Sequence, residues 1–149
     1  MKAIGIIVLL LVVGLGAVTL MITKEPDRTL DAQGQTWLDE FRAWSESVST
    51  QVTTAERGMS FGTPQKNARL LAPLRSCGRT LAQVGEPPTL LKDVKTAGLQ
   101  ACGQAQVALA KNEEFGQAAY ATMRLHLAEV SDQLRLAERN ITLALEGPS

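Results

Sequence analysis

A run of apolar residues at the start of the chain constrains the fold more than any other feature. Residues 3–22 read AIGIIVLLLVVGLGAVTLMI and include no charged side chain. As a helix, this run would be about 30 Å long, which matches the hydrocarbon core of a bilayer. The apolar core of a secretory signal peptide is shorter, at about 7–15 residues. We therefore expect residues 1–24 to form an uncleaved transmembrane signal anchor, and residues 25–149 to form the domain that it holds.

The orientation of this single span is set by weak signals. Lys2 precedes the run, whereas Lys24 and Arg28 follow it among acidic residues, so the basic residues on the two sides almost balance. The chain has two cysteines, both in the domain, and a pair of this kind is typical of an oxidising compartment. We expect a cytoplasmic N-terminus and an extracytoplasmic domain. Cleavage among the small residues of 14–19 is the alternative, and it would release a secreted protein.

The rest of the chain predicts an all-α domain. Aromatic residues make up only 4% of the chain, which suits helices packed through Ala and Leu better than a β-sandwich. Apolar residues recur at helical spacing in four segments. These segments are residues 27–56, 63–84, 89–111 and 113–145. Because the connections are short, we expect an antiparallel up-down four-helix bundle.

Several local signals set the expected limits of these helices. Thr63 and Pro64 are suited to open the second helix, and Pro73 should kink or restart it. Residues 85–88, Gly-Glu-Pro-Pro, form the strongest turn signal in the domain. Asn112 should cap the fourth helix, whose apolar face would begin at Phe115.

Two tryptophans and a phenylalanine lie on one face of the first predicted helix. Trp37, Phe41 and Trp44 are spaced by four and three residues, so they form a helical stripe. Such a stripe normally forms the bulky end of a core. The sharper hypothesis is that it forms the end of the bundle that holds a small ligand. The third helix carries small residues on its apolar face, so we expect its neighbours to approach it closely.

Charge is segregated along the chain, although the formal net charge is zero. Acidic residues dominate residues 25–56, basic residues dominate 57–111, and the last third is acidic again. One interpretation is pairing between helices of the same bundle, where an exposed pair contributes about 0.2–1 kcal/mol. The other is a basic surface for a partner, lipid headgroups or an anionic polymer. This candidate interaction surface comprises Arg69, Arg75, Arg79, Lys92 and Lys95. A neutral chain is not expected to bind nucleic acid.

Cys77 and Cys102 are a candidate disulfide. They flank the 85–88 turn at unequal distances, which in straight helices would offset them by about 9 Å along the axis. A disulfide needs Cα atoms within about 7 Å of each other. We expect the bridge to form because the turn extends into residues 89–91 or because the helices cross at an angle. Two buried thiols or an intermolecular bridge remain as alternatives.

Motifs that carry catalysis or bind a cofactor do not stand out in the sequence. His126 is the only histidine, which makes a metal site within one chain improbable on composition, and no phosphate-binding glycine loop or nucleophile elbow is present. We therefore expect no enzyme, no cofactor and no metal. The hypothesis is a membrane-anchored domain that acts through protein contact, as an accessory subunit of a membrane complex or an envelope adaptor. The alternative is an anchored or secreted bundle that binds a small ligand or acts as an inhibitor.

The assignment of the fourth helix face can be tested by removing one core side chain. Leu134 lies on the predicted apolar stripe of residues 113–145. Leu134→Ala should lower the free energy of unfolding by about 2–5 kcal/mol, because a buried leucine leaves a cavity when it is truncated. The measurement is a denaturant titration of both proteins. An unchanged midpoint would mean that the face is wrongly assigned.

Overall fold

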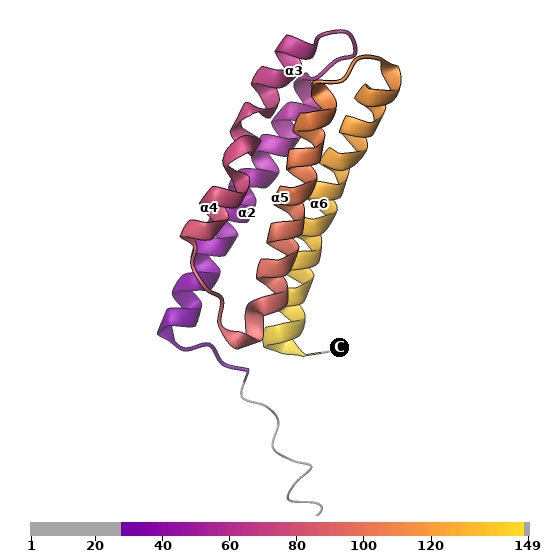
Figure 1. Ribbon diagram of the computed structural model, residues 1–149. Coiled ribbons are helices and arrows are strands. Elements are labelled where there is room, and N and C mark those ends of the chain that lie inside the picture. Colours follow the sequence, from indigo (N-terminus) through magenta and orange to yellow (C-terminus); the bar gives the residue numbers. More distant parts are fainter. Residues whose placement is uncertain (1–27, 148–149) are drawn as a thin grey trace, which may run out of the picture.

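The computed structural model describes residues 28–147, and this part of the chain is helical with no strand. Four segments run up and down the molecule (Figure 1). Their elements are α2 (Ala32–Gly58), α3 (Pro64–Leu71), η1 (Ala72–Ser76), α4 (Cys77–Gln83), η2 (Thr89–Leu91), α5 (Lys92–Asn112) and α6 (Gln117–Glu146). The predicted all-α four-helix architecture is confirmed, with α3, η1 and α4 together forming the second segment.

Helix α2 begins later than the sequence pattern predicted. The carboxylate of Asp31 accepts a 2.7 Å hydrogen bond from the backbone N–H of Gly34, which makes Asp31 the N-cap. The helix then continues to Gly58, where Met59 adopts extended backbone geometry and ends it. The helix face that carries Trp37, Phe41 and Trp44 is buried, as the spacing predicted.

The second segment is interrupted where Pro73 was predicted to break it. Pro64 occupies the first turn of α3, where the missing N–H costs no helical hydrogen bond. Pro73 lies in the first turn of the 3₁₀ segment η1, which separates α3 from α4. A proline here removes one helical donor and clashes with the preceding turn. The tighter 3₁₀ turn relieves that conflict without ending the segment.

The predicted start of the fourth helix is wrong. Helix α5 runs through Asn112, and α6 begins only at Gln117, so residues 113–116 form a loop. Gly116 is the residue that precedes α6, with a φ of 107° that favours glycine. The side chain of Asn112 does not cap α6, because its amide donates to the carbonyl of Pro64 instead. Phe115 therefore lies in the loop and is 92% exposed, not part of the core.

The four segments form a closed bundle in which each segment has two neighbours. Helix α5 packs most extensively against α6, and α2 lies between α6 and the α3–α4 segment. Both ends of the described chain lie at the same end of the bundle, where the Arg28 guanidinium packs against Gly147. The α2–α3 and α5–α6 loops lie together at the opposite end (Figure 1). We call these the proximal and distal ends.

No helix among residues 28–147 is long and apolar enough to cross a membrane. The predicted span, residues 3–22, lies outside the described residues, so the transmembrane part of the predicted fold remains a prediction.

The core pairs a bulky face of α2 with a small face of α5. Trp37 and Phe41 stack at 5.2 Å between ring centroids, and Phe41 meets Trp44 at 5.3 Å. A Cβ built at Gly98 of α5 would lie 3.1 Å from Phe41 and 3.2 Å from Trp44. The ring edges therefore fill the space that a side chain at position 98 would need. The predicted close approach to the third helix occurs here, across the diagonal of the bundle.

This contact predicts opposite outcomes at two glycines of α5. Gly98→Leu should lower the free energy of unfolding by about 1–3 kcal/mol, because the new side chain overpacks the core. Gly103 has nothing within 4 Å of an added Cβ, so Gly103→Leu should raise the same quantity by up to about 1 kcal/mol through helix propensity. Denaturant titration of both variants tests this. Equal stabilities would contradict the diagonal contact.

Candidate functional site

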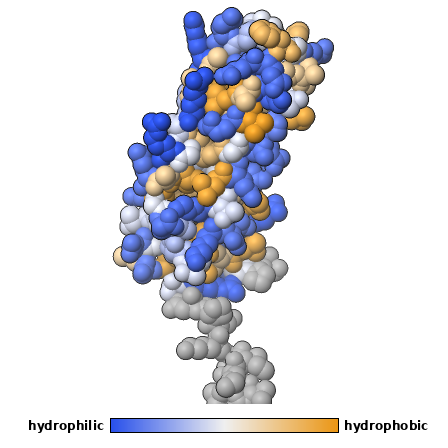
Figure 2. Space-filling model, in the orientation of Figure 1, coloured by the Kyte–Doolittle hydropathy of each residue, from blue (hydrophilic) through white to orange (hydrophobic). Residues whose placement is uncertain are grey.

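The distal end carries the most exposed aromatic residues of the described chain. Phe61 in the α2–α3 loop is 58% exposed, and Phe115 in the α5–α6 loop is 92% exposed. Phe61 meets the partly buried Tyr120 of α6 edge-on, with ring centroids 5.9 Å apart. Figure 2 shows apolar residues gathering at this end of the molecule. We call Phe61, Phe115 and Tyr120 the distal aromatic cluster.

A buried asparagine holds the α2–α3 loop in shape. Asn67 of α3 is 3% exposed, and its side-chain amide donates a 3.0 Å hydrogen bond to the carbonyl of Ser60. Its Oδ1 accepts from the Ser60 N–H at 3.1 Å and from the Thr63 hydroxyl at 3.3 Å. Thr63 therefore precedes the helix as predicted, but its hydroxyl bonds to Asn67 and Ser60 and makes no cap bond to the helix.

The two distal loops are also joined to each other. The Asn112 amide at the end of α5 donates a 3.2 Å hydrogen bond to the Pro64 carbonyl at the start of α3. Gly62 and Gly116 follow the two exposed phenylalanines, and both have positive φ, at 81° and 107°. Positive φ is costly for other residues, so these glycines let each loop turn and present its phenylalanine outward.

An open pocket of about 130 Å³ lies within the distal aromatic cluster. Phe61, Phe115 and Tyr120 form its apolar wall, and Pro64 and the buried Met123 complete it. Its rim is polar and carries the Lys111–Glu114 ion pair, with 2.6 Å between Nζ and Oε1. The pocket can accept one apolar group while the rim remains hydrated.

Three of the five predicted interaction residues form an exposed group on the second segment. Arg69, Arg75 and Arg79 are exposed on α3, η1 and α4, and Lys66 of α3 extends the row toward the distal end. Within the part of the chain that the structure describes, none of these four residues makes an ion pair. The sequence from Arg57 to Gly85 contains no acidic residue. We call these four residues the basic row.

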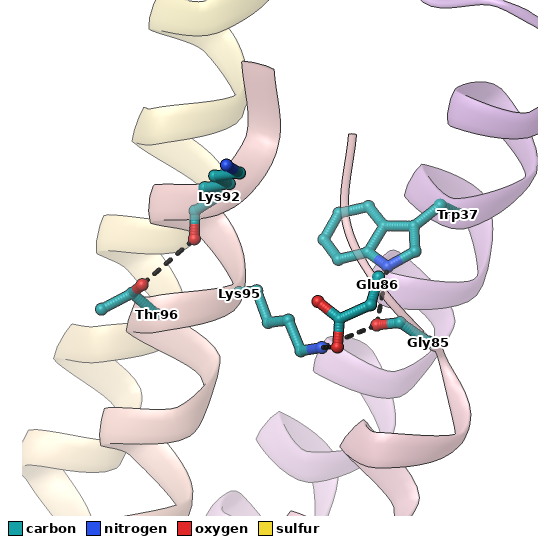
Figure 3. Close-up of polar contacts among 6 residues, drawn as sticks. All are labelled: Trp37, Gly85, Glu86, Lys92, Lys95 and Thr96. Carbon is teal, nitrogen blue, oxygen red and sulfur yellow. Dashed lines mark hydrogen bonds and ion pairs between the residues drawn. The ribbon is translucent and has the colours of Figure 1, made fainter. Parts of the chain in front are cut away.

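The other two predicted interaction residues lie on α5, near the proximal end. Lys95 is only 17% exposed, and its amine donates at 2.9 Å both to the Gly85 carbonyl and to Glu86 Oε1 (Figure 3). The Trp37 indole N–H donates to the same carbonyl at 3.3 Å, so Gly85 is held from two helices. Lys92 is exposed at the start of α5, so it lies on a different segment from the basic row.

The predicted ligand end is buried. Trp37, Phe41 and Trp44 are 5%, 0% and 6% exposed, as expected of a core stripe. The Trp44 indole N–H donates to the Cys77 carbonyl and to the Thr80 hydroxyl, which joins α2 to α4. Open grooves run beside Trp37 and Trp44, but because both side chains are buried, little of either ring is accessible from its groove. A ligand at this end remains a prediction.

The predicted disulfide is present. Cys77 at the start of α4 is joined to Cys102 of α5, with Cα atoms 5.4 Å apart and 25 residues of separation. Both residues are buried, and the carbonyl of Cys77 accepts a hydrogen bond from the indole of Trp44 in the aromatic stripe of α2. The chain extends through η2 before α5 begins, which brings the two cysteines level, as the sequence required.

His126 makes a polar contact that joins two helices. Its Nδ1 lies 2.7 Å from Oε1 of Gln104, so the ring joins α6 to α5. Among residues 28–147, no group of three His, Cys, Asp or Glu side chains is placed to hold a metal ion.

Sequence reasoning missed the two exposed phenylalanines. Phe61 was placed in a loop without a role, and Phe115 was assigned to a core stripe. A signal was present, because Phe-Gly occurs at both 61–62 and 115–116, in the two connections at the distal end. Two apolar side chains beside glycines in polar loops indicate exposed groups.

No protein-family model matches the chain, and the searches of curated proteins and of solved structures gave no match either.

The disulfide is expected to contribute measurably to the free energy of unfolding. Replacing both residues, as in Cys77→Ala/Cys102→Ala, should lower the free energy of unfolding by about 3 kcal/mol, because the bond restricts the unfolded chain. Denaturant titration measures this, with the reduced wild-type protein as the matched control. A loss in the double variant but none on reduction would assign the effect to packing and not to the bond.

Proposed function

We propose that the chain is a non-enzymatic, membrane-anchored helical bundle that acts through protein contact outside the cytoplasm. Its role is that of an accessory subunit of a membrane complex or an envelope adaptor. The observation that carries the proposal is the separation of the two ends of the bundle. The chain enters at the proximal end, and the exposed aromatic residues lie at the distal end.

This arrangement suits an anchored interaction domain. The apolar residues 3–22 precede the proximal end in sequence, so an anchor would hold that end near the bilayer. Helix α2 has 27 residues, and its length of about 40 Å carries the distal loops away from the anchor. Exposed apolar patches on soluble domains commonly mark contact sites. A disulfide in the core fits an oxidising compartment.

The charge distribution supports a partner of opposite sign. The four cations of the basic row are exposed and make no ion pair within the described residues, whereas Arg42 and Lys95 lie beside carboxylates. Exposed cations without an ion pair also occur on other segments, at Arg57, Lys92, Arg124 and Arg139. The basic row is therefore distinguished by having four such cations on one segment that contains no acidic residue. Intrachain pairing therefore accounts for part of the segregated charge and leaves this row available. A row of unpaired cations steers an acidic partner and fixes its orientation.

The alternative function is a secreted or anchored bundle that binds a small ligand or acts as an inhibitor. The open groove beside Trp37, lined also by Asp31 and Pro88, is the feature that favours it. That groove is wide and polar along one side, and the tryptophan that would recognise a ligand is 95% buried by the bundle. We rank this function second.

Membrane anchoring and compartment can be tested together on the full-length chain. Membranes from cells that produce the protein are washed with alkaline carbonate. The intact mass of the chain that stays in the membrane is then measured by mass spectrometry under non-reducing conditions. We expect retention, a mass that includes residues 1–24, and a mass two hydrogens lighter than the dithiol. Leu10→Arg is the matched control, since an arginine at the centre of a span costs about 2.5–3.5 kcal/mol and should reduce retention.

Co-purification then tests the contact function. In mild detergent we expect the full-length chain to bring down a membrane complex in fixed stoichiometry. A soluble mature chain that starts near Ala17 or later, and that purifies alone, would contradict the proposal.

A further inference from the structure

We propose that the distal pocket binds a protein segment in which one aromatic or leucine side chain is followed by carboxylates. This inference deepens the proposed function and rests on it, because it assumes that the distal end faces away from the anchoring membrane. The apolar side chain would enter between Phe61 and Phe115. The carboxylates would lie along Lys66 and Arg69.

The first step is the size and chemistry of the pocket. Its volume of about 130 Å³ is close to that of a cavity that holds one benzene ring, which is about 150 Å³. Phe61, Phe115 and Tyr120 offer ring faces and edges, and aromatic groups pack favourably against such partners. One ring or one branched aliphatic side chain therefore fits the pocket volume.

The second step is preorganisation of the pocket. The α2–α3 loop, which carries Phe61, is held by hydrogen bonds to a buried side chain, and the α5–α6 loop, which carries Phe115, follows a helix end that is bonded to α3. Asn67 fixes the α2–α3 loop through three hydrogen bonds, and Asn112 ties α5 to the start of α3. Gly116 sets the direction of the other loop. A site that is rigid before binding loses less entropy when its partner arrives.

The third step is the charge around the pocket. Lys66 and Arg69 follow the pocket residue Pro64 on α3, and both are exposed and unpaired within residues 28–147. On the opposite rim, Glu114 is paired with Lys111, and Glu113 remains as an acidic group. The formal charges on the two sides are therefore opposite, with two cations on the α3 side and a net charge of minus one from Lys111, Glu113 and Glu114 on the other. A segment with its carboxylates on the α3 side is favoured, and the reverse orientation is disfavoured.

The same charges select a protein over a lipid surface. An anionic bilayer would meet Glu113 and Glu114 together with the lysines, which weakens its attraction. The bilayer that holds residues 3–22 would also lie at the other end of the bundle, about 40 Å away along α2. A narrow acidic segment can contact α3 while avoiding the acidic rim.

The test uses the full-length chain in nanodiscs of neutral phosphatidylcholine and a displayed library of random 12-residue peptides. We expect enrichment of peptides that carry Phe, Tyr, Trp or Leu with Asp or Glu within the next four positions. The variant Phe61→Ser/Phe115→Ser serves as counter-selection. Because both side chains are exposed, this variant should keep the wild-type circular dichroism spectrum and melting temperature.

Titration of the best peptide by fluorescence anisotropy then separates the two parts of the site. We expect Phe61→Ser/Phe115→Ser to weaken binding about tenfold or more, as removal of a central aromatic contact does. Lys66→Glu/Arg69→Glu should weaken it by a similar factor and remove most of its salt dependence. Arg75→Glu/Arg79→Glu makes the same charge change farther from the pocket, and its effect should be several-fold smaller.

Each other outcome overturns the inference. Peptides that bind Phe61→Ser/Phe115→Ser and wild type equally would place the site elsewhere, and the absence of any enrichment would remove it. Phenylalanine-dependent binding to phosphatidylglycerol vesicles, without peptide binding, would make a lipid surface the occupant. Concentration-dependent dimerisation lost in Phe115→Ser would make a second copy the occupant.

Failure of this inference can be distinguished from failure of the proposed function. A membrane complex that co-purifies equally with wild type and with Phe61→Ser/Phe115→Ser would leave the contact function standing and remove the distal site. A chain that binds the acidic peptides but is released from membranes by carbonate would retain the site and remove the anchor.

Discussion

The contact on which the rest of the structure depends is the one between the aromatic stripe of α2 and Gly98 of α5. Trp37, Phe41 and Trp44 are the three aromatic residues of the buried core, and their ring edges reach across the bundle to α5. A full side chain at position 98 would push α2 and α5 apart. The second segment and α6 could not then close around both helices, because each packs against the pair. Tight interiors tolerate such a change poorly.

The polar bonds and the disulfide preserve this contact from outside the stripe. Trp37 and Lys95 hold the carbonyl of Gly85, and Trp44 holds the carbonyl of Cys77, so the indoles fix α4 as well as filling the core. The disulfide joins the same part of α4 to α5, one turn beyond Gly98. At the distal end, the loops are held by hydrogen bonds from Asn67 and Asn112 and not by apolar packing, and their phenylalanines remain exposed. Rigidity there is therefore provided by hydrogen bonds, and the apolar groups are left for a partner.

Local chemistry and periodicity were sufficient to predict the four helical segments, the break at Pro73, the buried stripe on α2 and the Cys77–Cys102 bridge. They were not sufficient at the start of α6. Asn112 has the side chain of a good cap, but a bond to Pro64, a residue distant in sequence, removes it from that role. Phe115 fits the helical spacing and yet lies in a loop. Lys95 was grouped with the arginines by charge, whereas a carbonyl and a carboxylate hold it near the proximal end. The roles of Asn112 and Lys95 depend on residues that contact them only in the folded chain, and the order of residues in the sequence does not reveal those contacts.

The most direct test of this account is to observe the contact across the diagonal of the bundle in solution. Two-dimensional nuclear magnetic resonance of the full-length chain can detect through-space transfer between the Hα protons of Gly98 and the ring protons of Phe41 and Trp44. The account predicts strong cross-peaks to both rings, and Hα shifts displaced by the ring currents. If Gly98 shows neither cross-peak while α5 remains helical, the aromatic stripe does not meet α5, and the packing described for this bundle is wrong.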